Sequence, residues 1–95
     1  MTLIQEGNRL NIEGNIKSTK DFEEIEAAVE GLLNGYESII LNITDSMSLT
    51  SSVIGYLVKV VNENGKKVYL NVGSNDLYTL LDELDLLNVF YVKRI

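Results

Sequence analysis

The sequence contains no cysteine, no histidine, no proline and no tryptophan among its 95 residues. Without cysteine the chain has no disulfide and no thiolate ligand for structural zinc, and without histidine it has no imidazole base. No apolar run approaches the roughly 20 residues that a membrane-spanning helix needs. These absences exclude several classes of enzyme and metal site, and no cofactor is expected.

The composition is that of a globular protein, with 45% hydrophobic and 23% charged residues. The length predicts one domain spanning residues 1–95. The formal net charge of -6 disfavours binding to phosphate backbones and anionic lipids, so neither nucleic acid nor membrane insertion is expected. Met1–Gln5 lacks the basic segment and apolar core of a secretion signal, and a cytoplasmic location is therefore expected.

Hydrophobic periodicity predicts a strand pair at the beginning of the chain, over Thr2–Gln5 and Arg9–Glu13, joined by a tight turn at Gly7-Asn8. A helix then begins at a capping box formed by Ser18 and Asp21. Gly35 is expected to end that helix in the left-handed conformation.

The second half of the chain repeats this alternation of strand and helix. Ser38–Ile43 is a nearly continuous apolar run, which predicts a strand covered on both faces. A helix closed by Asn64-Gly65, a strand over Lys67–Val72, a helix capped by Ser74 and a strand over Val89–Val92 follow. The order β-β-α-β-α-β-α-β predicts an α/β fold with three helices and a mainly parallel sheet that has one antiparallel edge.

One segment, Thr44–Ser52, is unusually rich in hydroxyls, which six of its nine residues carry. It joins the buried strand to the second helix, at the carboxyl end of the sheet where α/β proteins bind ligands. The unpaired amides at a helix start favour an anion such as a phosphate. The alternative is a capped turn, because one hydroxyl among Thr50, Ser51 and Ser52 is expected as an ordinary N-cap.

Other chemistry finds no support in the sequence. Gly73–Asp76 lacks the glycine pattern and the lysine of a nucleotide-binding loop. A serine nucleophile has no base at a recognisable spacing. The acidic side of the first helix is interpreted as a solvated face, and Tyr69, Tyr78 and Tyr91 as core or rim residues rather than a stacking platform. We therefore do not expect an enzyme.

The segment from Ile39 to Leu57 resembles the STAS domain of bacterial anti-sigma factor antagonists. That family has a buried strand, a short loop, a hydrophobic residue and then Asp-Ser-Ser-Gly-Leu-Gly opening a helix. The corresponding residues are the strand Ile40–Ile43, Leu49, and Thr50-Ser51-Ser52-Val53-Ile54-Gly55-Tyr56-Leu57. Gly65 and the segment Leu80–Leu86 resemble later family positions, so the similarity extends over nearly the whole chain.

The chain departs from the family pattern at four positions. Thr50 stands for the loop aspartate, Asn42 for an acidic strand residue, Val53 for a glycine and Asp85 for a late glycine. A final family helix is not expected before the chain stops at Ile95.

The resemblance implies a phosphorylation site at the start of the second helix. In the family, the serine after the aspartate accepts phosphate from an ATP-using anti-sigma kinase, and Ser51 holds that position. A biofilm-associated subset with a Thr-Ser-Ser run accepts phosphate on the threonine, which corresponds to Thr50. The implied partner-binding residues are Ser46, Ser48, Thr50, Ser51, Ser52, Ile54 and Gly55.

The resemblance implies a signalling protein of transcription regulation that acts by partner switching. Its partners would be an anti-sigma factor or related Ser/Thr protein kinase and a phosphatase that resets the switch. A STAS scaffold that never cycles phosphate, within a lipid-transport or stress-signalling complex, remains an alternative. A third hypothesis is that the chain binds a small ligand or is an enzyme on this scaffold. A homodimer through apolar residues near Leu84–Leu87 is a further expectation.

Overall fold

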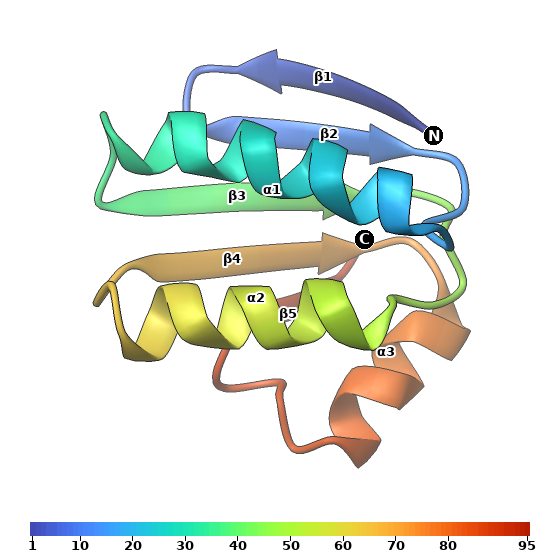
Figure 1. Cartoon of the computed structure of the whole chain (residues 1–95). Helices are drawn as coiled ribbons and strands as arrows, with labels where there is room; N and C mark the ends of the chain where they lie inside the picture. The colour runs from blue at the N-terminus through green and yellow to red at the C-terminus, as the bar shows by residue number, and fades with distance from the viewer.

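A computed structural model describes all 95 residues, which form five strands and three helices. In chain order the elements are β1 (Thr2–Glu6), β2 (Arg9–Glu13), α1 (Thr19–Leu33), β3 (Ser38–Ile43), α2 (Ser51–Asn62), β4 (Lys67–Val72), α3 (Asn75–Glu83) and β5 (Val92–Arg94). The strands lie in the order β1-β2-β3-β4-β5, and only β1 and β2 are antiparallel (Figure 1). The predicted α/β class, the mixed sheet and the three helices are confirmed.

The hydrophobic core lies on one face of the sheet. Because each parallel strand is the neighbour of the one before it, right-handed crossovers bring every connecting helix to the same side. Alternate residues of β2, β3 and β4 are buried, and they form one cluster with the buried residues of α1, α2 and α3. The prediction that β3 is covered on both faces is therefore wrong, and Ile40 is only half-buried.

The opposite surface of the sheet, here called the open face, carries no helix. Its residues alternate with the buried ones and are Thr2, Ile4, Glu6, Arg9, Asn11, Glu13, Ser38, Ile40, Asn42, Lys67, Tyr69, Asn71, Tyr91 and Lys93. Tyr69 and Tyr91 are 38% and 49% exposed, so neither is a core residue. Their rings stack on each other with centroids 5.1 Å apart.

Local signals in the first half of the chain are mostly reproduced. Gly7 has a φ of 59°, as the tight turn between β1 and β2 requires. The Ser18 hydroxyl accepts from the Asp21 amide at 3.0 Å, and the Asp21 carboxylate accepts from the Ser18 amide at 3.2 Å. Hydrogen bonds from the amides of Lys17 and then Ser18 lower the pKa of Asp21. The capping box is confirmed.

Glycines were expected at the ends of both α1 and α2, but only the one after α2 adopts a positive φ. Gly65 has a φ of 67° after α2, and the Lys66 amide donates to the Val60 carbonyl, as at a helix end closed by glycine. Gly35 does not adopt a positive φ, because Asn34 closes α1 in the right-handed conformation and the Gly35 amide donates to Leu32. The left-handed conformation predicted for Gly35 is therefore wrong.

The end of the chain forms a turn where a strand was expected. Asp85 follows the C-cap of α3 with a φ of 58°, and β5 begins only at Val92, not at Val89. The amide of Phe90 donates to Leu86, its carbonyl accepts from Leu70, and its side chain is wholly buried. The apolar residues around Phe90 thus reach the core from a turn. A run of apolar residues in the sequence does not distinguish such a turn from a strand.

Candidate functional site

The hydroxyl-rich loop between β3 and α2 is held in place from its own interior. Ser46 is 1% exposed; its hydroxyl accepts from the Ile16 amide at 3.0 Å and donates to the Ser48 carbonyl at 2.8 Å. Asp45 accepts from the Gly14 amide at 2.7 Å. Ser46 was expected among the partner-binding residues, but its burial removes it from the surface. Its role is to fix the loop.

A close backbone approach also positions the start of this loop. The Gly73 amide donates to the Ile43 carbonyl at 2.9 Å. A Cβ on Gly73 would lie 2.9 Å from the carbonyl carbon of Thr44 and closer still to its oxygen. Only glycine fits between the ends of β3 and β4, and the sequence carried no signal of this contact.

Thr50 is the N-cap of α2. Its hydroxyl accepts from the Val53 amide at 3.2 Å, and its backbone is extended, with φ -71° and ψ 154°. One hydroxyl of the Thr-Ser-Ser run therefore has the ordinary structural role that the capped-turn interpretation requires.

Ser51 and Ser52 differ from Thr50, because both are exposed in the first turn of α2 and make no side-chain hydrogen bond within the chain. That turn contains no acidic residue, so no carboxylate competes for its amides. These two hydroxyls remain unexplained by the capped turn.

An exposed surface surrounds the two serines. Ser48 and Gly55 are exposed and Ile54 is half-buried, and positions 54 and 55 follow Ser51 by three and four residues on one helix face. Met47, which sequence reasoning missed, is 59% exposed in the same loop. We call these residues the loop–helix surface: Met47, Ser48, Ser51, Ser52, Ile54 and Gly55. The signal that could have identified Met47 is its place as an apolar residue within a polar loop.

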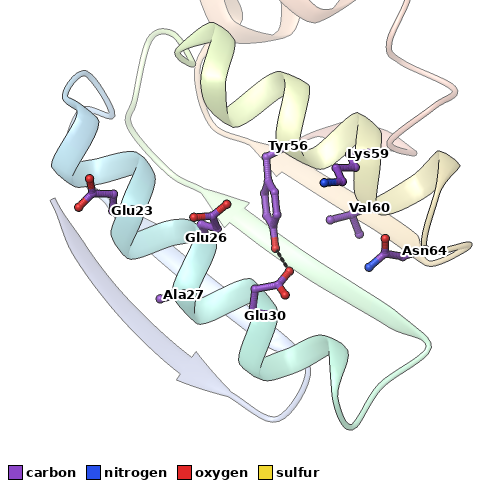
Figure 2. A pocket seen from close by; sticks show the side chains of 8 residues that line it. All are labelled: Glu23, Glu26, Ala27, Glu30, Tyr56, Lys59, Val60 and Asn64. Carbon is purple, nitrogen blue, oxygen red and sulfur yellow. Dashed lines mark hydrogen bonds between the residues drawn. The ribbon is translucent and has the colours of Figure 1, made fainter.

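A separate groove of about 410 Å³ lies between α1 and α2 (Figure 2). Glu23, Glu26 and Glu30 line it from α1, and Tyr56 and Lys59 from α2. The acidic side of α1 was interpreted from the sequence as a solvated face. In the structure, part of that side forms one wall of this groove. The groove includes none of the residues of the loop–helix surface.

Tyr56 links the two helices across this groove. Its hydroxyl donates to the Glu30 carboxylate, and its ring meets Phe22 edge to face with centroids 6.1 Å apart. Burial, and then the hydrogen bond to Glu30, raises the pKa of Tyr56 well above its ordinary value of 10.0. The phenol therefore stays protonated in the folded chain.

We expect alkaline pH to reveal this contact. Below pH about 10 the phenol is neutral in both states, so its stabilisation is fully present. Above that pH the unfolded chain ionises at Tyr56 while the folded chain does not, and the free energy of unfolding falls. In Tyr56→Phe the free energy of unfolding should fall less steeply above pH about 10. At pH 7 it should differ from that of the wild type by about 1 kcal/mol or less.

Urea unfolding across the alkaline range measures this difference. Tyr36→Phe is the matched control, because it removes an exposed phenol that bonds no carboxylate. An equally steep alkaline loss in Tyr56→Phe and the wild type would show that the contact with Glu30 is not its cause.

No protein-family model matches the sequence, and a search of curated proteins finds no significant relative. None of the three helices is long and apolar enough to cross a membrane.

Proposed function

We propose that this chain is a regulatory protein–protein interaction module, similar to STAS-domain antagonists of anti-sigma factors, that is switched by phosphorylation of Ser51. The observation that carries the proposal is the difference between neighbouring hydroxyls at the start of α2. Thr50 is occupied as the N-cap, whereas Ser51 is exposed and bonds nothing within the chain. The function needs no catalytic group of its own.

Ser51 is the better acceptor of the two candidates. Phosphorylation of Thr50 would first remove its hydroxyl from the Val53 amide and so weaken the cap, which costs about 1 kcal/mol. Phosphorylation of Ser51 removes no hydrogen bond. The hydroxyl of Ser51 attacks the γ-phosphorus of ATP held by a partner kinase, ADP leaves, and a base of the kinase takes the proton. A phosphatase restores the hydroxyl by hydrolysis, which releases inorganic phosphate.

The phosphate acts as a switch through its charge. It adds about -1.5 to -2 charges next to helix amides that face no competing carboxylate. The domain therefore keeps its fold, while a partner surface complementary to neutral hydroxyls meets a dianion. A cost of about 2.7 kcal/mol weakens partner binding a hundredfold.

Two further observations support the similarity to the STAS family. Asp85 stands where the family has glycine, and its φ of 58° is a conformation that glycine adopts most easily. The run Thr50-Ser51-Ser52 opens a helix directly after a loop from a buried strand, as the family motif does. Both are features of local geometry that are consistent with the proposed similarity.

Mass analysis of the protein isolated from its native cells tests this proposal. We expect one phosphate on the peptide that contains Thr44–Lys59, retained in Ser52→Ala and lost in Ser51→Ala. Ser52→Ala is the matched control, because it removes a neighbouring exposed hydroxyl. Co-purification of the partner should fall about a hundredfold with Ser51→Asp but not with Thr19→Asp, which places the same charge at an exposed hydroxyl in the first turn of α1.

The alternatives give different results. Phosphate that persists in Ser51→Ala and disappears in Thr50→Ala would assign the acceptor to Thr50. An unmodified peptide under all growth conditions, with partner binding unchanged in Ser51→Asp, would contradict the switch. That result would favour a constitutive STAS-like scaffold subunit.

A further inference from the structure

The open face is unusual for a sheet of this kind. Strands β2 to β5 are parallel, and parallel sheets ordinarily have both faces covered. Here all three helices pack on one side, so the other side carries its own pattern of apolar, amide and charged side chains. That pattern identifies what can cover it.

An apolar row covers the β3–β5 side of the open face, at the level where β2 carries Arg9 and β1 carries Glu6. Ile40 pairs in register with Tyr69, and the ring of Tyr69 stacks on that of Tyr91 at an interplanar angle of 24°. At the next level, Ile4 of β1 is 44% exposed. Covering these side chains would remove apolar surface from water, which favours association.

An asparagine row runs beside the apolar one. Asn71 donates to Asn42 at 2.8 Å, Asn42 donates to Asn11 at 2.8 Å, and Asn11 donates to Glu6 at 3.2 Å. One N–H of each asparagine is thus bonded sideways, along the sheet, as are the side-chain oxygens of Asn42 and Asn11. Covering the row therefore carries a smaller desolvation cost than covering three unbonded amides.

Charge divides the open face into two complementary halves. The β1–β2 half carries Glu6 and Glu13 with Arg9, whereas the β4–β5 half carries Lys67 and Lys93 and no acid. From this division we infer that the open face binds a second copy of the chain. The two-fold axis runs parallel to the strands near β3, so that β1–β2 of each copy covers β4–β5 of the other. An axis across the strands would place like charges together.

The size of the face sets the strength of this dimer. Five strands about 4.8 Å apart, of which β2 has five residues, β3 six and β5 three, give a projected area of roughly 400 Å² per copy. Standard interfaces bury about 800 Å² per partner, so the dimer is weak and reversible. Single-stranded nucleic acid fits less well, because the net charge is -6 and the two tyrosine rings already stack on each other.

Sedimentation equilibrium over micromolar to millimolar concentrations tests the inference. We expect the wild type to dimerise and the double variant Lys67→Glu/Lys93→Glu to bind itself at least about tenfold more weakly. Lys17→Glu/Lys20→Glu, with the same charge change at exposed positions near the start of α1, is the matched control and should dimerise as the wild type does. Mixing Lys67→Glu/Lys93→Glu with Glu6→Lys/Glu13→Lys should restore a dimer.

Single cysteines in this cysteine-free chain test the axis. Ile40→Cys lies on the central strand and should cross-link to its own copy with a short bis-maleimide. Ile4→Cys should not, because β1 strands of the two copies lie roughly 19 Å apart across four strand spacings. Cross-linking of Ile4→Cys but not Ile40→Cys would overturn the proposed arrangement.

Three results would overturn the inference itself. The first is a wild type that stays monomeric up to millimolar concentration. The second is a dimer that Lys67→Glu/Lys93→Glu leaves intact but Leu84→Ser abolishes, which would place the interface at Leu84–Leu87. The third is a monomer that binds a single-stranded oligonucleotide, with the binding lost in Tyr69→Ala.

Discussion

Gly73→Ala is expected to lower the free energy of unfolding by about 3 kcal/mol, the upper end of the range for inserting a methyl group into a packed site. The new Cβ would lie against the Thr44 carbonyl, which is backbone and has no rotamer to move away. Relief requires the ends of β3 and β4 to separate, at the cost of the bond from the Gly73 amide to Ile43. Urea unfolding of the variant measures the loss.

Gly31→Ala is the matched control for this prediction. Gly31 lies inside α1, is exposed, and has no atom within 4 Å of the position that a Cβ would take. Alanine there should stabilise the domain by about 0.5–1 kcal/mol, because glycine is the weaker helix former. Equal effects from the two substitutions would contradict the close approach of Gly73 to Thr44.

Phe90→Ala is expected to lower the free energy of unfolding by about 3–5 kcal/mol, as other truncations of buried aromatic side chains do. Phe90 is wholly buried and belongs to the single core cluster, while its backbone joins the final turn to β4. The cavity left by the ring cannot close without moving that turn. Thermal and urea unfolding measure the effect, and hydrogen exchange should show β5 losing protection.

Phe22, the other phenylalanine, provides the comparison. It is half-buried and packs against the edge of Tyr56 rather than filling the core. Phe22→Ala should therefore cost less than half as much as Phe90→Ala. If Phe90→Ala cost no more than Phe22→Ala, the final turn would not be the core element that the fold indicates.

Much of the candidate site was predictable because its signals are local. Hydroxyls before an apolar helix predict an N-cap whatever surrounds them, and Thr50 has that role. The alternation of apolar residues likewise predicted the buried face of β4, whereas β3, with its nearly continuous apolar run, is buried on one face only. The burial of Ser46 was not predictable, because it depends on the Ile16 amide, 30 residues away in the chain.

The sequence alone determined the strands and helices, except the last strand, because periodicity, caps and turn residues act within a few positions of each other. The tertiary structure decided which surfaces remained free. It placed all helices on one face and left the other open, since sequential strand order and crossover handedness together set the side that helices cover. It also separated Ser51, which is exposed, from Thr50 and Ser46, whose hydroxyls are bonded within the chain. Thr50 is distinguished by the Val53 amide three residues later, a local partner, whereas Ser46 is distinguished by the Ile16 amide 30 residues away, which only the tertiary structure brings near.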